Sequence, residues 1–227
     1  MQKTRWDSLA LLIVLMGLAG CSVSTSPASL GFTRINGGTA YSLTDGTAMS
    51  GTVVIPATWK GLPVTAIGDS AFLDCAAMTS LTIPAGITSI GASAFHGCSG
   101  LSSLTIPDSV TSIGDGAFFS CIGLSAITLP SSLAGIMPDE FYGCSSLTAL
   151  TLPASVTTIG PGAFDYCEAL TTVSVLATTP PTFENTALDA FASCYDLATI
   201  YVPVGDEPAY ATAPGWSPHS SLIIESP

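Results

Sequence analysis

A repeat of 23 residues constrains this chain more than any other feature of its sequence. Isoleucine, phenylalanine, cysteine and proline each recur at that spacing, and each keeps a fixed place within the repeat. A regular period of this length is typical of proteins built from stacked, similar units, in which each unit packs only against its neighbours. The sequence therefore predicts one elongated domain. The repeated positions are Ile67, Ile90, Ile113, Ile136 and Ile159; Phe72, Phe95, Phe118, Phe141 and Phe164; Cys75, Cys98, Cys121, Cys144 and Cys167; and Pro84, Pro107, Pro130 and Pro153.

Each copy contains two short segments in which apolar and polar residues alternate. In one copy these are Leu104-Thr-Ile-Pro107 and Val110-Thr-Ser-Ile-Gly114. Alternation with a period of two predicts a strand, and proline ends the first strand because it has no N–H to donate to a neighbour. The following Ala117-Phe-x-x-Cys121 is too short for a regular helix and predicts a helical turn. The chain is therefore expected to be mainly β, with stacked parallel strands.

The repeat resembles the BspA-type leucine-rich repeat of bacteria. That consensus is close to L-x-x-L-x-I-P-x-x-V-x-x-I-G-x-x-A-F-x-x-C, and the resemblance extends over residues 53–203. It implies a right-handed, curved leucine-rich-repeat solenoid, capped at both ends because an uncovered end coil would expose its core. The family includes adhesion proteins, so the resemblance also implies recognition of a protein ligand.

The N-terminal end of the repeat region departs from the pattern. Residues 32–52 predict a hairpin cap, because Asn36-Gly-Gly38 supplies the positive φ angles that a tight turn needs. Five extra residues within 57–63 predict a loop that leaves the stack.

The C-terminal end departs in a similar way. Four residues are inserted within 177–185, and residues 204–227 resemble the C-terminal cap of the same family. In that cap, Asp206 is expected to cap a short helix with Pro208 in its first turn. Trp216 is expected to cover the last coil.

The fourth copy differs from the others at two positions. Met137 replaces the glycine that ends the second strand, and Glu140 replaces the alanine before the phenylalanine. The sequence leaves two interpretations open, a tolerated local distortion and a functional notch.

The first 31 residues predict export and a lipid anchor. Lys3 and Arg5 precede an apolar run that is too short to span a bilayer, and the run ends in Leu18-Ala-Gly-Cys21. This segment resembles a bacterial lipoprotein signal peptide, residues 1–20, cut before a lipidated Cys21. Residues 21–31 are small and polar and predict a flexible tether. Ser22 is not the aspartate that retains many lipoproteins in the inner membrane, so the resemblance implies the outer membrane. Whether the domain is surface-exposed or periplasmic stays open.

The charge of the chain restricts its partners. Four basic residues oppose 16 acidic ones, for a formal net charge of −12. Such a surface repels phosphate backbones and anionic lipid headgroups, so nucleic-acid binding and electrostatic membrane docking are excluded. The predicted contact with a membrane is made through the lipid on Cys21. The oligomeric state stays open.

The repeat cysteines favour buried free thiols over disulfides. Equivalent residues of neighbouring coils lie about 5 Å apart, which permits a disulfide, but their Cβ atoms point the same way rather than toward each other. An oxidising compartment keeps the disulfide alternative open.

The sequence offers no catalytic, metal or cofactor site. It lacks the spacings of zinc ligands, phosphate loops, dinucleotide fingerprints and nucleophile elbows. His96 occupies a variable position, and Leu73, Phe119, Tyr142 and Asp165 fill the equivalent slots of other copies. We therefore expect a protein that is not an enzyme.

The outward positions of the first strand in each copy form the candidate binding surface, which we name the strand face. It is rich in threonine, with one aromatic residue and therefore no evident hot spot for binding. Three functions remain open: adhesive or protein–protein recognition of a protein or extracellular-matrix ligand, a structural envelope role without a specific ligand, and, least favoured, a glycan-binding or glycan-cleaving module. The strand face comprises Ser80, Thr82, Ser103, Thr105, Thr128, Thr151, Thr172, Ser174 and Tyr201.

Overall fold

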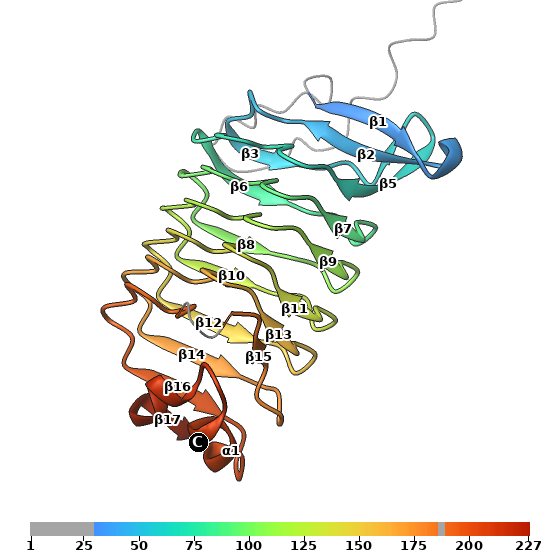
Figure 1. Ribbon diagram of the computed structural model, residues 1–227. Coiled ribbons are helices and arrows are strands. Elements are labelled where there is room, and N and C mark those ends of the chain that lie inside the picture. The colour runs from blue at the N-terminus through green and yellow to red at the C-terminus, as the bar shows by residue number, and fades with distance from the viewer. Residues whose placement is uncertain (1–29, 186–188) are drawn as a thin grey trace, which may run out of the picture.

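The computed structural model describes residues 30–185 and 189–227, which form a stack of parallel coils with a cap at each end (Figure 1). Each coil has three sides: a long strand, a two-residue strand and a turn. The predicted β-solenoid is therefore confirmed. Cys21 and the rest of the predicted signal and tether up to residue 29 lie outside the described residues.

The elements follow one another along the stack from the N-terminal hairpin to the C-terminal helix (Figure 1). They are β1 (Gly31–Ile35), η2 (Asn36–Gly38), β2 (Ala40–Asp45), β3 (Gly51–Val54), β4 (Thr58–Trp59), β5 (Leu62–Ile67), β6 (Met78–Thr82), β7 (Ser89–Ile90), β8 (Ser103–Thr105), β9 (Ser112–Ile113), β10 (Ala126–Thr128), β11 (Gly135–Ile136), β12 (Ala149–Leu152), β13 (Thr158–Ile159), β14 (Thr172–Val175), β15 (Thr182–Phe183), β16 (Thr199–Val202), α1 (Glu207–Thr212), η3 (Ser217–Leu222) and β17 (Ile223–Glu225).

Equivalent strands of successive coils pair in parallel and in register. Among the long strands, β8 pairs with β10, and β12, β14, β16 and β17 form one sheet. The short strands form a second row, in which β5, β7 and β9 pair in order and β11, β13 and β15 pair in order. A parallel register that advances by one repeat places each residue beside its equivalent in the next coil, which explains why the sequence repeats so regularly.

The N-terminal cap contains the predicted hairpin. Strands β1 and β2 pair antiparallel around Asn36, Gly37 and Gly38, all of which have positive φ angles. Strand β2 then pairs in parallel with β5, so the cap begins the row of short strands. The predicted loop over 57–63 is instead a small hairpin of β4 and β5, and its Trp59 ring stacks on Phe32 at 4.7 Å.

The turns carry the centre of the core. In each turn the cysteine N–H donates to the phenylalanine carbonyl three residues earlier, as in Cys121 and Phe118 at 3.1 Å, which confirms a single helical turn. The phenylalanine rings are buried and stack from coil to coil with centroids 5.2–5.8 Å apart, the row being Phe72, Phe95, Phe118, Phe141, Phe164 and Phe191.

The six repeat cysteines are free thiols, as the sequence favoured. From the second onward, each Sγ–H donates to the phenylalanine carbonyl of the preceding coil; Cys121, for example, donates to Phe95 at 3.0 Å. Burial raises the pKa of the Cys121 thiol to about 12, so the reactive thiolate is suppressed at neutral pH. The cysteine ladder thus serves packing and hydrogen bonding between coils.

The C-terminal residues show the expected burial of Trp216 and the expected position of Pro208, but not the expected capping by Asp206. The indole of Trp216 is fully buried against Phe183 at 5.1 Å, and its Nε1–H donates to the carbonyl of Pro181 at 2.7 Å. Helix α1 begins after Asp206 with Pro208 in its first turn. The expected capping bond was wrong, since the Asp206 side chain makes no hydrogen bond to the first turn.

The unusual fourth copy interrupts the row of short strands. Elsewhere the glycine at this corner lets neighbouring backbones meet; a Cβ on Gly114 would collide with the backbone of Ala92. Gly114 N–H donates to the carbonyl of Ile90 at 3.0 Å. Met137 carries a Cβ at the equivalent corner, and β9 and β11 belong to separate sheets.

Glu140 supplies the bond that this interruption removes. Its Oε2 accepts the Met137 N–H at 2.7 Å, while the whole side chain is buried. Its Oε1 has no hydrogen-bond partner within the described part of the chain, and desolvation raises the carboxyl pKa to about 8 despite the Met137 bond. The two departures in sequence are therefore one compensated change, in which the glutamate side chain replaces a backbone acceptor.

We expect Phe118→Ala to lower the free energy of unfolding by about 3–5 kcal/mol, because it removes one ring from the middle of a buried stack. Chemical denaturation followed by circular dichroism measures this loss. The control is Thr128→Ala at an exposed strand position, with an expected change within about 0.5 kcal/mol. Equal, small effects of the two substitutions would contradict the core assignment.

Glu140 predicts a specific pH dependence of stability. Its pKa is raised in the folded chain, so its contribution to stability is fully present below the ordinary glutamate pKa of 4.5 and is lost as pH rises toward about 8, where the folded state also ionises. The free energy of unfolding of the wild type, measured by chemical denaturation, should therefore fall over this window relative to that of Glu140→Gln. The expected fall is on the order of a few kcal/mol in total. Parallel pH profiles of the two proteins would rule out a buried, protonated Glu140.

Candidate functional site

The predicted strand face lies on the long-strand side, where its residues are register neighbours within separate sheets. All nine of its residues are at least partly exposed. Thr105 pairs with Thr128 across β8 and β10, and Ser174 lies between Thr151 and Tyr201 across β12, β14 and β16. The sheet order breaks between β6 and β8 and between β10 and β12. The face offers hydroxyl groups over a flat surface, with Tyr201 near one end.

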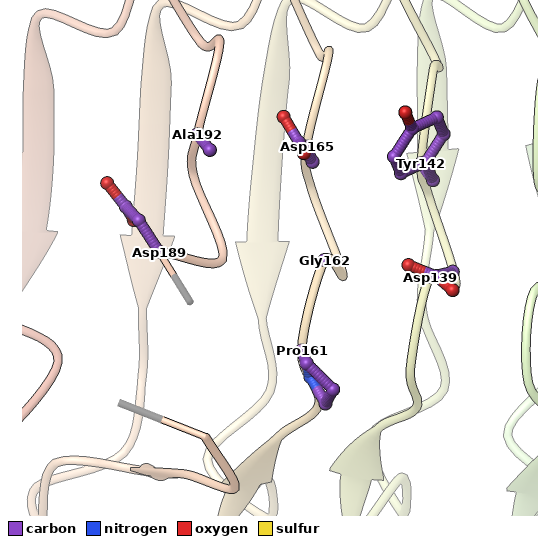
Figure 2. A pocket seen from close by; sticks show the side chains of 7 residues that line it. All are labelled: Asp139, Tyr142, Pro161, Gly162, Asp165, Asp189 and Ala192. Carbon is purple, nitrogen blue, oxygen red and sulfur yellow. The ribbon is translucent and has the colours of Figure 1, made fainter. Parts of the chain in front are cut away.

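A hollow lies on a different side, over the turns of three successive coils (Figure 2). Its volume is about 320 Å³, at the lower end of the range of about 300–1,000 Å³ that is typical of pockets for small groups. Three carboxylates and one tyrosine give it its polar character. Its lining consists of Asp139, Tyr142, Pro161, Gly162, Asp165, Asp189 and Ala192.

The hollow exists because one repeat position alternates in size along the stack. Asp139, Gly162 and Asp189 each stand two residues before the phenylalanine of their turns. Asp139 and Gly162 have positive φ angles of 53° and 67°, a conformation that glycine and aspartate tolerate better than most residues. A Cβ at residue 162 would collide with Oδ1 of Asp139, so this carboxylate leans over the glycine. The missing side chain at 162 thus makes room for the Asp139 carboxylate at the edge of the hollow.

The carboxylates around the hollow sit in different environments. Desolvation, together with the charges of Asp115 and Asp165, raises the pKa of the Asp139 carboxyl. The pKa of Asp189 is lowered, chiefly by His219, whose Nε2 lies 3.0 Å from its Oδ1. Oδ1 of Asp165 is shielded from solvent and has no hydrogen-bond partner among residues 30–185 and 189–227. Asp139 and Asp165 are thus the less satisfied members.

A row of rings leads up to the hollow along the turns; we name it the ring strip. His96 stacks on Phe119 at 4.8 Å, Phe119 on Tyr142 at 4.6 Å, and Tyr166 tilts against Tyr142 by 49° at 5.2 Å. His96, Phe119 and Tyr142 are half-buried and each directly follows the buried phenylalanine of its turn, whereas Tyr166 is exposed. The parallel stack ends at Tyr142, because Asp165 occupies the next equivalent slot.

Sequence reasoning did not identify this strip or the hollow. It noted that His96, Phe119, Tyr142 and Asp165 fill equivalent slots, but it treated the slot as variable. The available signal was that three successive copies place a ring there. The hollow itself depended on Gly162 between two aspartates, a contrast that becomes informative only once the turns are known to stack.

Two further findings concern the described residues. No group of three or more histidine, cysteine or acidic side chains in the described ranges is arranged to hold a metal ion. No helix of that same part of the chain has the length and apolar character needed to cross a bilayer.

The stacked coils, the row of parallel strands and the buried cysteine and phenylalanine ladders define a leucine-rich-repeat solenoid. Comparison with protein families matches residues 65–198 to the BspA type leucine rich repeat region, in six copies. The match covers more than half of the chain, which therefore belongs to the BspA-type leucine-rich-repeat family. None of the curated proteins compared with the chain matches it.

Two solved structures illustrate the similarity. The leucine-rich repeat protein TpLRR of T. pallidum is 29% identical, with a TM-score of 0.69 over 78% of this chain and 84% of that one. A leucine-rich cell surface protein from Faecalibacterium prausnitzii is 28% identical, with a TM-score of 0.62 over 82% of this chain and 56% of that one.

Proposed function

We propose that the protein is a lipid-anchored component of the bacterial cell envelope that recognises a protein ligand through the strand face. The observation that carries the proposal is the register of the long strands, which sets exposed hydroxyl residues of successive coils side by side. A flat surface of this kind contacts a partner over many coils rather than holding a small molecule. Adhesion to a host or matrix protein is the specific form of recognition that we favour.

The family supports the general part of this proposal. Repeat solenoids present extended surfaces that suit protein binding. The similar protein from Faecalibacterium prausnitzii is described as a cell surface protein, although this chain covers only 56% of its length. The N-terminal sequence resembles a lipoprotein signal peptide, which supports an anchor on Cys21. Together with the similarity to a cell surface protein, it leads us to propose surface exposure on the outer membrane.

The anchor is tested by Cys21→Ala. We expect this change to abolish incorporation of labelled palmitate and to move the protein from the detergent phase to the aqueous phase, because two or three acyl chains are needed for stable anchoring. Cys194→Ala is the matched control, since it removes a repeat thiol and should leave both readouts unchanged. Protease treatment of intact cells then reports the side: protection until lysis would contradict surface exposure and favour a structural role inside the envelope.

The strand face is tested by the double substitution Thr105→Lys and Thr128→Lys. These residues are exposed register neighbours, so two long charged side chains should obstruct a flat interface and weaken ligand binding about tenfold or more. Binding of the purified protein to immobilised host and matrix proteins measures this effect. Thr88→Lys with Thr111→Lys adds the same charge on the short-strand side and should change binding less than about twofold.

The outcomes of this assay separate the alternative functions. Saturable binding that only the strand-face variant loses supports protein recognition. An absence of saturable binding to any protein, or equal losses in both double variants, would contradict it and leave a structural envelope role. Binding to glycan arrays instead of proteins would favour the third function.

A further inference from the structure

We propose that the turn side of the solenoid carries a second recognition surface, in which the hollow at Tyr142 receives an arginine or lysine side chain from a basic segment of a partner protein. This surface is separate from the strand face, and its occupant is defined by charge and ring chemistry.

The first step is the geometry at the end of the ring strip. The ring of Tyr142 is parallel to that of Phe119 within 7°, so one of its faces is covered by the stack. The other face is turned toward the next coil, where the Tyr166 ring lies against it, tilted by 49° at a centroid distance of 5.2 Å. That next coil offers Asp165 in the equivalent slot and Gly162 beneath it, and both line the hollow. The part of the Tyr142 ring that lines the hollow therefore borders a space with carboxylates around it (Figure 2).

The second step is that the strip has no evident role in the core. The phenylalanine row already fills the interior, and its members are buried. Tyr166, by contrast, is 43% exposed, and Leu73, in the slot before His96, is 37% exposed. Contiguous apolar and aromatic groups on the surface of a soluble domain mark interaction sites more often than isolated ones do.

The third step is the absence of an internal partner for the charges. Lys60 is the last lysine or arginine of the sequence, whereas all acidic residues except Asp7 and Asp45 follow it. The one ion pair within the described ranges joins His219 to Asp189. Asp139 and Asp165 therefore face the hollow without a cationic neighbour, and one oxygen of Asp165 lacks any donor in the described part of the chain. A cationic group from a partner would pair with the Asp139 carboxylate and offset the negative charge of Asp165.

The fourth step selects the kind of cation. A guanidinium or ammonium group placed on an aromatic face gains a cation–π interaction, and arginine adds paired hydrogen bonds to carboxylates. Tyr142 and the two carboxylates offer both interactions within one hollow. A bare metal ion fits less well, because the described side chains provide no group of three suitable ligands. The exposed rings along the strip supply apolar contacts for neighbouring residues of a bound segment.

The test uses the full-length protein in detergent and a fluorescent peptide of alternating arginine and glycine. Anisotropy titrations compare Asp139→Asn with Asp165→Asn, as a double variant, against Asp196→Asn with Glu207→Gln, which remove the same charge from exposed positions outside the hollow. We expect the first pair to weaken binding about tenfold and the second less than about twofold at physiological salt. Tyr142→Leu should also weaken binding severalfold, and leucine already occupies this slot as Leu73.

A citrulline version of the peptide separates charge from shape, since it keeps the side-chain outline and removes the cation. We expect it not to bind. Equal losses in the two double variants would show attraction to net charge alone and overturn the proposal, as would unchanged binding by Tyr142→Leu or tight binding of the citrulline peptide. Thermal melts confirm that the variants remain folded. Thr105→Lys with Thr128→Lys should retain peptide binding, so failure of the strand-face proposal is distinguishable from failure of this one.

Discussion

Hydrogen bonding between equivalent positions of adjacent coils is the constraint on which this structure depends. Peptide groups in the turns and in most strands donate to the coil one repeat away, as Phe95 N–H does to Ala117 at 2.8 Å and Thr111 N–H does to Thr88 at 2.9 Å. Each side chain is thereby placed against its own equivalent, which makes stacked phenylalanines and aligned cysteines the natural filling of the core. The same constraint requires a residue without a side chain wherever two backbones converge, as at Gly114.

The constraint also explains how a copy can deviate without unfolding the stack. Met137 prevents close approach on the short-strand side, and Glu140 then satisfies the stranded N–H from within the core. The turns of the same two coils remain bonded, since Phe118 N–H still donates to the carbonyl of Glu140 at 2.9 Å. This arrangement costs free energy, because it buries a carboxyl group, and the desolvation raises its pKa to about 8.

The fold was predictable because each position of the repeat recurs in several copies of the sequence. Proline and glycine mark the strand ends, and the ladders identify the core, so the strands and the turns followed from spacing. The free thiols followed from the parallel direction of equivalent Cβ atoms, and the burial of Trp216 was implied by the family resemblance. Details that occur once were harder: the packing of Trp59 on Phe32 and the unused side chain of Asp206 depend on contacts outside the repeat. The hollow escaped prediction for a related reason, because it arises from differences between copies, with Gly162 flanked by two aspartates.

The lack of lysine and arginine beyond Lys60 has a consequence for how neighbouring copies of the protein interact. Two solenoids that approach side by side both carry a net negative charge, and their mutual repulsion acts over about 8 Å at physiological ionic strength. The end caps oppose association along the other direction, because β1 with β2 and Trp216 cover the terminal coils. A crowded layer of such molecules would spread out rather than cluster, and each copy would keep its faces open to other proteins.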